Sequence, residues 1–147
     1  MLVHPMSYPA IRACLAVTVL AAGCAGELEQ PERFAECPDG YVEFIFHEVC
    51  GGACHGDQLP EAGLDLSSNG VAARVLGTPS QTGGPCAGKL LVDPDAPDDP
   101  SAHLLLDKLL EEPSCGAPMP PEGDLLNRDQ RECVRRWIVE AIESEAR

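Results

Sequence analysis

The spacing of apolar side chains predicts a helix at each end of the folded part of this chain. Near the C-terminus, apolar residues recur every three or four positions, so they share one face of a helix. That helix should begin at Asn127, because Gln130 three residues later completes a capping box. Apolar residues between 41 and 49 also lie at helical spacing, although their β-branched and aromatic content leaves a strand possible. The C-terminal stripe consists of Val134, Trp137, Ile138, Ala141 and Ile142.

Shorter apolar segments lie between these two helices. We expect a helix at 70–76, with Ser68 or Asn69 as its cap, and another at 102–110, with Ser101 as its cap. Loops rich in glycine and proline separate them, and no internal repeat is present. The pattern favours an all-α fold with long loops. The loops are 77–88 and 111–124, and the buried leucines of the second short helix should be Leu105, Leu106 and Leu109.

The N-terminus has the pattern of an export signal. Arg12 precedes an apolar run at 13–22 that is too short to span a bilayer, and small residues follow it. Because a cysteine comes next, segment 1–23 resembles a bacterial lipoprotein signal, which would leave a lipidated Cys24 as the mature N-terminus. Ordinary cleavage near Ala22 or a retained membrane anchor are the alternatives. We expect an exported, periplasm-facing, lipid-anchored protein, with the outer membrane favoured over the inner.

Charge narrows the possible partners. The whole chain carries a net charge of −14, and the part after the signal keeps all Asp and Glu. Such acidity argues against nucleic-acid binding, which needs a basic face, and favours a protein partner with a basic docking face. Residues 24–40 are polar and acidic and predict a tether, and residues 41–147 predict one domain. A cluster of arginines lies close to acidic residues and predicts a salt-bridged solvent face, and its members are Arg128, Arg131, Arg135 and Arg136.

The chemistry of the chain centres on Cys50-Gly51-Gly52-Ala53-Cys54-His55. Two thiols followed by a histidine are the attachment chemistry of a c-type haem: the sulfurs form thioethers and the imidazole ligates the iron. The usual motif has two residues between the cysteines, and this one has three. Glycine tolerates the backbone conformations that an extra residue requires. A small Cys50–Cys54 disulfide without haem is the alternative, and a zinc site would need a fourth ligand.

A second iron ligand is predicted at Met119, which lies between Pro118 and Pro120. The prolines hold the methionine in a stiff loop, and its thioether is a soft ligand that suits reduced iron. It is the single methionine after the signal. His47 and His103 are competing candidates, but His47 is too close in sequence to His55, and His103 is expected at the surface.

Four other cysteines follow the signal and Cys24, and they indicate an oxidising compartment. Four cysteines form two disulfides with three possible connectivities, which spacing alone does not distinguish. The four are Cys37, Cys86, Cys115 and Cys133.

From about 41 to 141 the chain resembles a monohaem c-type cytochrome domain, of the divergent kind in exported proteins of planctomycetes and myxobacteria. The match consists of Cys50, Cys54, His55 and Gly56; Gly63 to Ser67; Lys89 to Pro94; Pro100-Ser101 with Leu104 to Leu106; Lys108-Leu109; Cys115-Gly116; Met119-Pro120; and Trp137-Ile138. The resemblance implies a cytochrome c-like fold in which the first and last helices cross. It implies one covalent haem c, with His55 as proximal and Met119 as distal iron ligand.

The resemblance also implies a disulfide pairing. Crossing of the terminal helices would bring Cys37 to Cys133, which leaves Cys86 with Cys115, and a Cys115–Cys133 bridge is the alternative. The haem pocket is expected to be lined by Phe44, Leu64, Leu66, Leu105 and Trp137.

The function expected from these features is single-electron transfer between redox proteins, without substrate chemistry. The first alternative is a haemless structural or binding lipoprotein with the same fold. The second is a haem enzyme module, which the plausible sixth ligand and the absence of a second haem motif disfavour.

Overall fold

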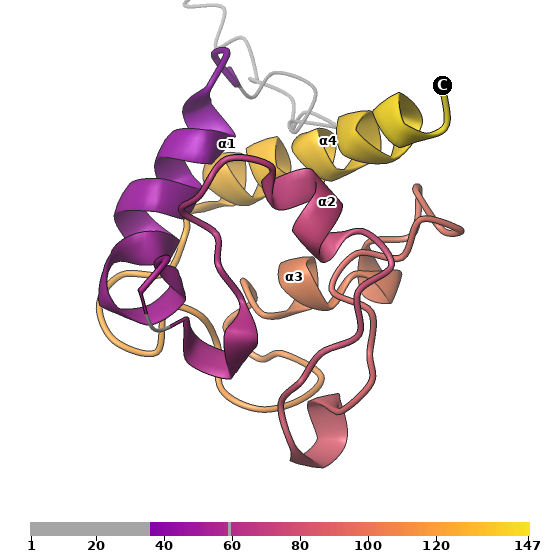
Figure 1. The fold of residues 1–147 in the computed structure, drawn as a ribbon. Helices are drawn as coiled ribbons and strands as arrows, with labels where there is room; N and C mark the ends of the chain where they lie inside the picture. Colours follow the sequence, from indigo (N-terminus) through magenta and orange to yellow (C-terminus); the bar gives the residue numbers. More distant parts are fainter. Residues whose placement is uncertain (1–35, 59) are drawn as a thin grey trace, which may run out of the picture.

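The computed structural model describes residues 36–58 and 60–147 (Figure 1). The signal at 1–23, the lipidation candidate Cys24 and the tether up to residue 35 lie outside the described residues. No helix among the described residues is both long and apolar enough to cross a bilayer.

Helices and loops make up the described part of the chain. Its two isolated β-bridges join Leu76 to Val92 and Pro79 to Leu90. The elements, in chain order, are α1 (Tyr41–Phe44), η2 (Ile45–His55), η3 (Glu61–Gly63), α2 (Val71–Val75), η4 (Gly84–Cys86), η5 (Pro100–Ala102), α3 (Leu104–Asp107) and α4 (Arg128–Glu145). The first helix is continuous from α1 into η2, because Phe44 and Ile45 at their junction both have right-handed helical dihedral angles.

The C-terminal helix α4 forms as predicted. The Asn127 side chain accepts a hydrogen bond from the Gln130 N–H, and the Gln130 side chain accepts one from the Asn127 N–H, each at 2.9 Å. The apolar stripe faces the core: Val134, Ile138, Ala141 and Ile142 are buried, and Trp137 packs against them at the edge. Arg135 forms a close pair with the Glu132 carboxylate on this helix, and Glu132 is buried.

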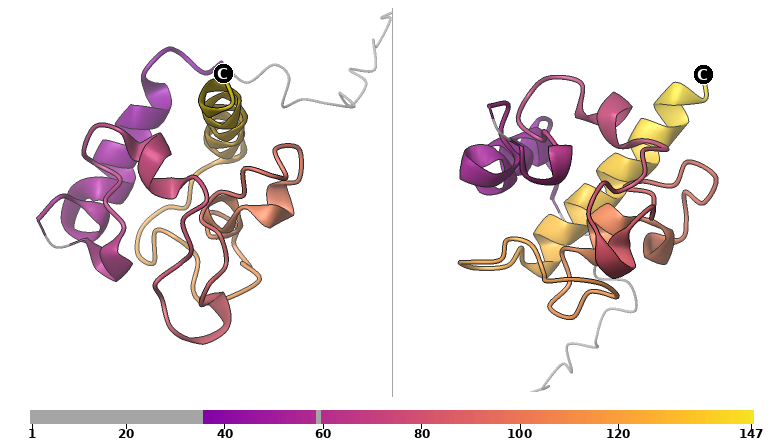
Figure 2. Two further views of the ribbon diagram at one scale, coloured as in Figure 1. Left: turned by 45° about the vertical axis from the view of Figure 1, so that its right-hand side comes forward. Right: turned by 60° about the horizontal axis from the view of Figure 1, so that its bottom comes forward.

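The first helix packs against α4, and the two cross at a steep angle in the left view of Figure 2. The rings of Phe46 and Trp137 meet edge to face there, with centroids 5.1 Å apart. A disulfide joins Cys37, just before α1, to Cys133 in α4. The predicted pairing is therefore present, and the alternative Cys115–Cys133 bridge is not formed.

The two middle helices are shorter than predicted, and their caps differ. Gly70, in a left-handed conformation, precedes α2 without a side-chain cap, so the prediction of Ser68 or Asn69 as its cap was wrong. The predicted helix at 102–110 divides into η5 and α3 because His103 between them is extended. Asp99, and not Ser101, caps η5: its carboxylate accepts the Ser101 N–H at 3.0 Å. Leu105, Leu106 and Leu109 are buried as expected.

Candidate functional site

A largely apolar cavity of about 410 Å³ lies between the first helix and the loops around α3. The four side chains predicted to hold a haem, which are Cys50, Cys54, His55 and Met119, all line this cavity. They come from two segments more than sixty positions apart in the sequence. Apolar side chains contribute many of the other wall residues, including Ile45, Phe46, Leu64, Leu66, Leu105, Leu109, Leu126 and Val134. Polar and charged residues, among them Glu61, Asp65 and Arg74, line the rest.

Two of the five predicted wall residues lie elsewhere. Phe44 is 56% exposed and stacks on Tyr41, and Trp137 does not line the cavity but donates its indole N–H to the Glu43 carboxylate at 3.3 Å. The helical phase explains the error for Phe44, because the cavity-facing positions of the first helix begin one residue later, at Ile45 and Phe46.

The cysteine motif lies at the end of η2, where the backbone has a π-helical pattern. A π-helix closes its hydrogen bonds from i to i+5, one residue wider than an α-helix, and π-bulges often occur at functional sites. This helical pattern is interrupted between the two cysteines, where the third residue of the spacing lies. Gly52 breaks the helix at φ 20° and ψ −121°, which a residue with a side chain would adopt only under strain. A Cβ on Gly51 would lie 3.0 Å from both the Phe46 carbonyl oxygen and the Ser67 Cβ.

The His55 ring is oriented by a backbone carbonyl. Its Nδ1 lies 3.1 Å from the Leu64 oxygen, and because a carbonyl only accepts, Nδ1 must carry the proton. The other ring nitrogen, Nε2, then has a free lone pair, which is the form in which histidine ligates a metal. The Leu66 N–H in turn donates to the His55 carbonyl at 2.8 Å. Sequence reasoning named His55 but had no means of finding its carbonyl partner.

The turn that carries Leu64 is itself held by side chains. Hydrogen bonding by Ser68, through its side chain and its N–H, and then by Ser67 holds the pKa of the Asp65 carboxyl well below the usual range. Arg74 of α2 donates to three carbonyls of the same turn, those of Asp65, Ser68 and Asn69, at 2.5–2.9 Å. The acceptor for His55 therefore belongs to a well-connected turn.

Met119 is held from α3. Its N–H donates to the Lys108 carbonyl at 2.7 Å, and the Met119–Pro120 peptide bond is cis. The Lys108 ammonium also lines the cavity, and burial lowers its pKa. The disulfide between Cys86 and Cys115 ties the start of this loop to the loop that carries η4, in agreement with the predicted pairing.

The competing histidines lie outside the cavity wall. His47 is exposed and pairs with Glu48 at 2.9 Å. His103 was expected at the surface, and this was wrong: it is 1% exposed, and its Nδ1 accepts the Asp93 N–H at 3.1 Å. His103 is buried because it stands between η5 and α3, where it satisfies a backbone donor. Within residues 36–58 and 60–147, His55 is consequently the one histidine, and Met119 the one methionine, that line the cavity.

The two motif thiols are not joined to each other, and their surroundings differ. Cys54 is exposed, whereas Cys50 is half-buried, and burial raises the pKa of its thiol to about 11. Among the described residues no group of three or more His, Cys, Asp or Glu side chains is arranged to hold a metal ion. The zinc alternative needs such a group, whereas an axially ligated haem does not.

In the haemless protein, iodoacetamide should alkylate Cys54 well before Cys50 at pH 8. The reagent attacks the thiolate, which Cys50 forms in quantity only as the pH approaches about 11. Peptide mass spectrometry over a time course measures the two rates, and repeating it at pH 10 should narrow the gap. Equal rates at pH 8 would contradict the burial of Cys50.

Lys108 and Arg74 are the site residues that sequence reasoning missed. Each is a single cation in a short segment whose other residues are mostly apolar, which is a weak signal for a buried role. Their partners are backbone carbonyls of loops, and no sequence pattern names such partners in advance.

Comparison with protein-family models, with curated proteins and with solved structures finds no match. The functional interpretation therefore rests on the chemistry and geometry of the site itself.

Proposed function

We propose that this protein is an exported, lipid-anchored monohaem c-type cytochrome with a cytochrome c-like fold, which carries single electrons between redox proteins. The observation that carries the proposal is that Cys50, Cys54, His55 and Met119 all line one apolar cavity. Three of them belong to the motif, but only folding brings Met119 to the same cavity. The packing of the first helix against α4 and the two disulfides also support it.

The residues present suit this cofactor. Cys50 and Cys54 are free to form the two thioethers, and the hydrogen bond to Leu64 prepares His55 Nε2 to ligate the iron. Met119 supplies the soft sulfur ligand, and a Met/His pair raises the reduction potential. When bound, the haem supplies an iron that takes up and releases one electron. The apolar wall limits the access of water, which disfavours reactions other than electron transfer.

The partner and location proposed for this carrier follow from its charge and its signal. Lipidation of Cys24 would hold the domain at a membrane facing the periplasm, with the outer membrane favoured. The acidic surface would steer a redox partner that has a basic docking face, without any affinity for nucleic acid.

The test of this function is a pyridine haemochrome spectrum of protein produced in a host with a cytochrome c maturation system. We expect one covalent haem per chain in the wild type and none in the Cys50→Ala/Cys54→Ala variant. His55→Ala should abolish low-spin iron or haem attachment, whereas the matched variant His47→Ala should leave both unchanged, because His47 lies outside the cavity wall. A wild-type protein without covalent haem in that host would reject the cytochrome in favour of a haemless lipoprotein.

A further inference from the structure

We propose that Lys108 is a positioning residue. It holds residues 115–119 of the loop at 111–124 in place, so that Met119 stays on the cavity wall as an iron ligand. This inference rests on the proposed function, since it concerns how the distal ligand is kept in place.

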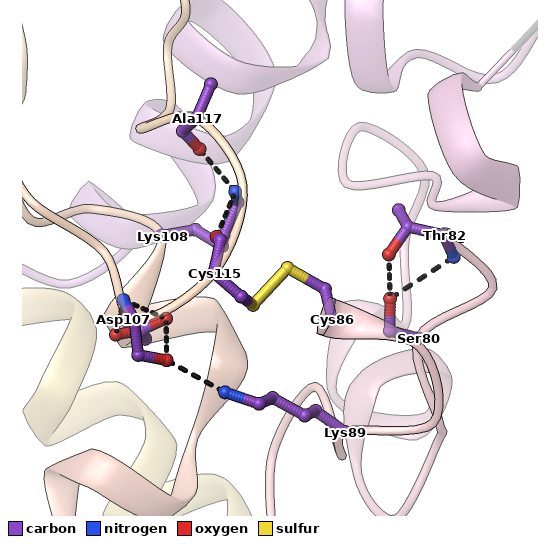
Figure 3. Close-up of a disulfide and its surroundings, with 9 residues drawn as sticks. Ser80, Thr82, Cys86, Lys89, Asp107, Lys108, Cys115 and Ala117 are labelled. Atoms are coloured by element: carbon purple, nitrogen blue, oxygen red, sulfur yellow. Dashed lines mark hydrogen bonds between the residues drawn. A yellow bond between two sulfur atoms is a disulfide. The ribbon is translucent and has the colours of Figure 1, made fainter. Parts of the chain in front are cut away.

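Lys108 contacts the loop at three points. Its Nζ donates to the Cys115 carbonyl at 3.0 Å and also donates to the Ala117 carbonyl, and both bonds are drawn in Figure 3. Its own backbone carbonyl accepts the Met119 N–H at 2.7 Å. Lys108 thus binds every second residue, at positions 115, 117 and 119, of the segment that ends at Met119.

This loop has a particular need for an external donor. Proline lacks a backbone N–H, and the prolines of the loop prevent a regular ladder of hydrogen bonds that would satisfy its carbonyls. The prolines lie at Pro113, Pro118, Pro120 and Pro121. An ammonium group, with three donors on a long stem, can bind two carbonyls at once. Hydrogen bonds from a charged donor are also stronger than those between neutral groups.

The start of the loop is held separately. The Asp107 carboxylate accepts the Ser114 N–H and hydroxyl, and Lys89 donates to the Ser114 hydroxyl at 2.8 Å (Figure 3). The Cys86–Cys115 disulfide fixes the next residue. These contacts end at Cys115. Beyond that point, the Lys108 ammonium binds the Ala117 carbonyl and the Lys108 backbone carbonyl binds the Met119 N–H.

The decisive variant is Lys108→Leu, which keeps an apolar stem but removes the donors. Methionine is avoided because it would introduce a second thioether at the cavity. Lys89→Leu is the matched control, because it removes a lysine that binds only the start of the loop. Lys108→Arg, which keeps a charged donor, should restore most of the wild-type behaviour.

In the haem-loaded protein, Lys108→Leu should retain covalent haem but lose much of the charge-transfer absorption between methionine sulfur and oxidised iron. It should also bind carbon monoxide more readily in the reduced state and have a lower reduction potential. Lys89→Leu should resemble the wild type in all three measurements. A merely structural role for Lys108 would lower thermal stability without changing the iron ligation at room temperature, and that result would overturn the proposal.

A second readout does not depend on haem. In the haemless Cys50→Ala/Cys54→Ala background, Lys108→Leu removes the two ammonium hydrogen bonds but keeps the backbone carbonyl that accepts the Met119 N–H. Because the loop should then open more often, exchange of the Met119 amide should accelerate by about tenfold or more. Unchanged exchange would overturn the positioning role. If the wild type never carries haem, the cytochrome proposal fails, and the exchange measurement still decides whether Lys108 holds the loop.

Discussion

Replacement of Met119 by alanine is expected to convert the iron from low spin to high spin while covalent haem content stays at the wild-type level. In the proposed haem-loaded protein, the thioethers and the His55 ligand would be untouched, but the cavity wall would lack the Met119 sulfur. Among the described residues, no other methionine and no second histidine line the cavity to replace it. Electronic absorption and electron paramagnetic resonance spectra of the oxidised protein measure the spin state, and the reduction potential should fall.

Pro121→Ala is the matched control for this variant, since Pro121 lines the same cavity from the same loop but has no ligating atom. Its spectrum should remain low spin. A Met119→Ala spectrum identical to that of the wild type would show that another residue binds the iron in the wild type. That result would remove Met119 from the site while leaving the attachment motif in place. A different low-spin spectrum would point to replacement by Lys108, which also lines the cavity.

Removal of the Cys37–Cys133 disulfide should produce the largest loss of stability among the changes considered. The bridge joins residues 96 positions apart, and cross-linking so long a loop stabilises the fold by about 4–5 kcal/mol through the entropy of the unfolded chain. The Cys86–Cys115 bridge spans 29 positions and should contribute about 3–4 kcal/mol. Urea unfolding of the two double-serine variants gives the two free energies of unfolding.

The order of the two variants should reverse when the iron spectrum is measured in place of stability: the Cys86–Cys115 variant should change more. Loss of Cys86–Cys115 frees the start of the Met119 loop and should weaken sulfur ligation, whereas the Cys37–Cys133 bridge includes no residue of that loop. A Cys37→Ser/Cys133→Ser protein that is as stable as the wild type would show that this disulfide does not stabilise the fold by constraining the unfolded chain.

Local sequence patterns correctly predicted the elements that are marked by more than one sequence feature. Helix α4 has an apolar stripe over two turns and a capping box, so two independent signals agree on its position. The motif from Cys50 to His55 can be recognised in the sequence because its residues are contiguous. Met119 stands out because a proline lies on each side of it. The short helices α2 and α3 were placed less well because each has only one or two turns, and a glycine or an extended residue changes where they begin.

Other features depend on contacts between distant segments. His103 is buried and Phe44 is exposed, contrary to their expected places, because burial depends on what packs opposite each side chain. The acceptor for His55 and the partners of Lys108 are backbone carbonyls, which every residue carries. Nothing in the residue types at Leu64, Cys115 or Ala117 marks those carbonyls as partners.

Short stretches of the sequence therefore determine which reactive groups this protein has, because thiols, an imidazole and a thioether are properties of the residue types. The tertiary structure alone decided that Met119 and the cysteine motif share one cavity, and that Leu64 and Lys108 hold the two candidate iron ligands. The physical reason is that cavities and carbonyl contacts form only when segments far apart in the chain pack together. That packing brings the proposed second ligand, Met119, to the widened motif from Cys50 to His55.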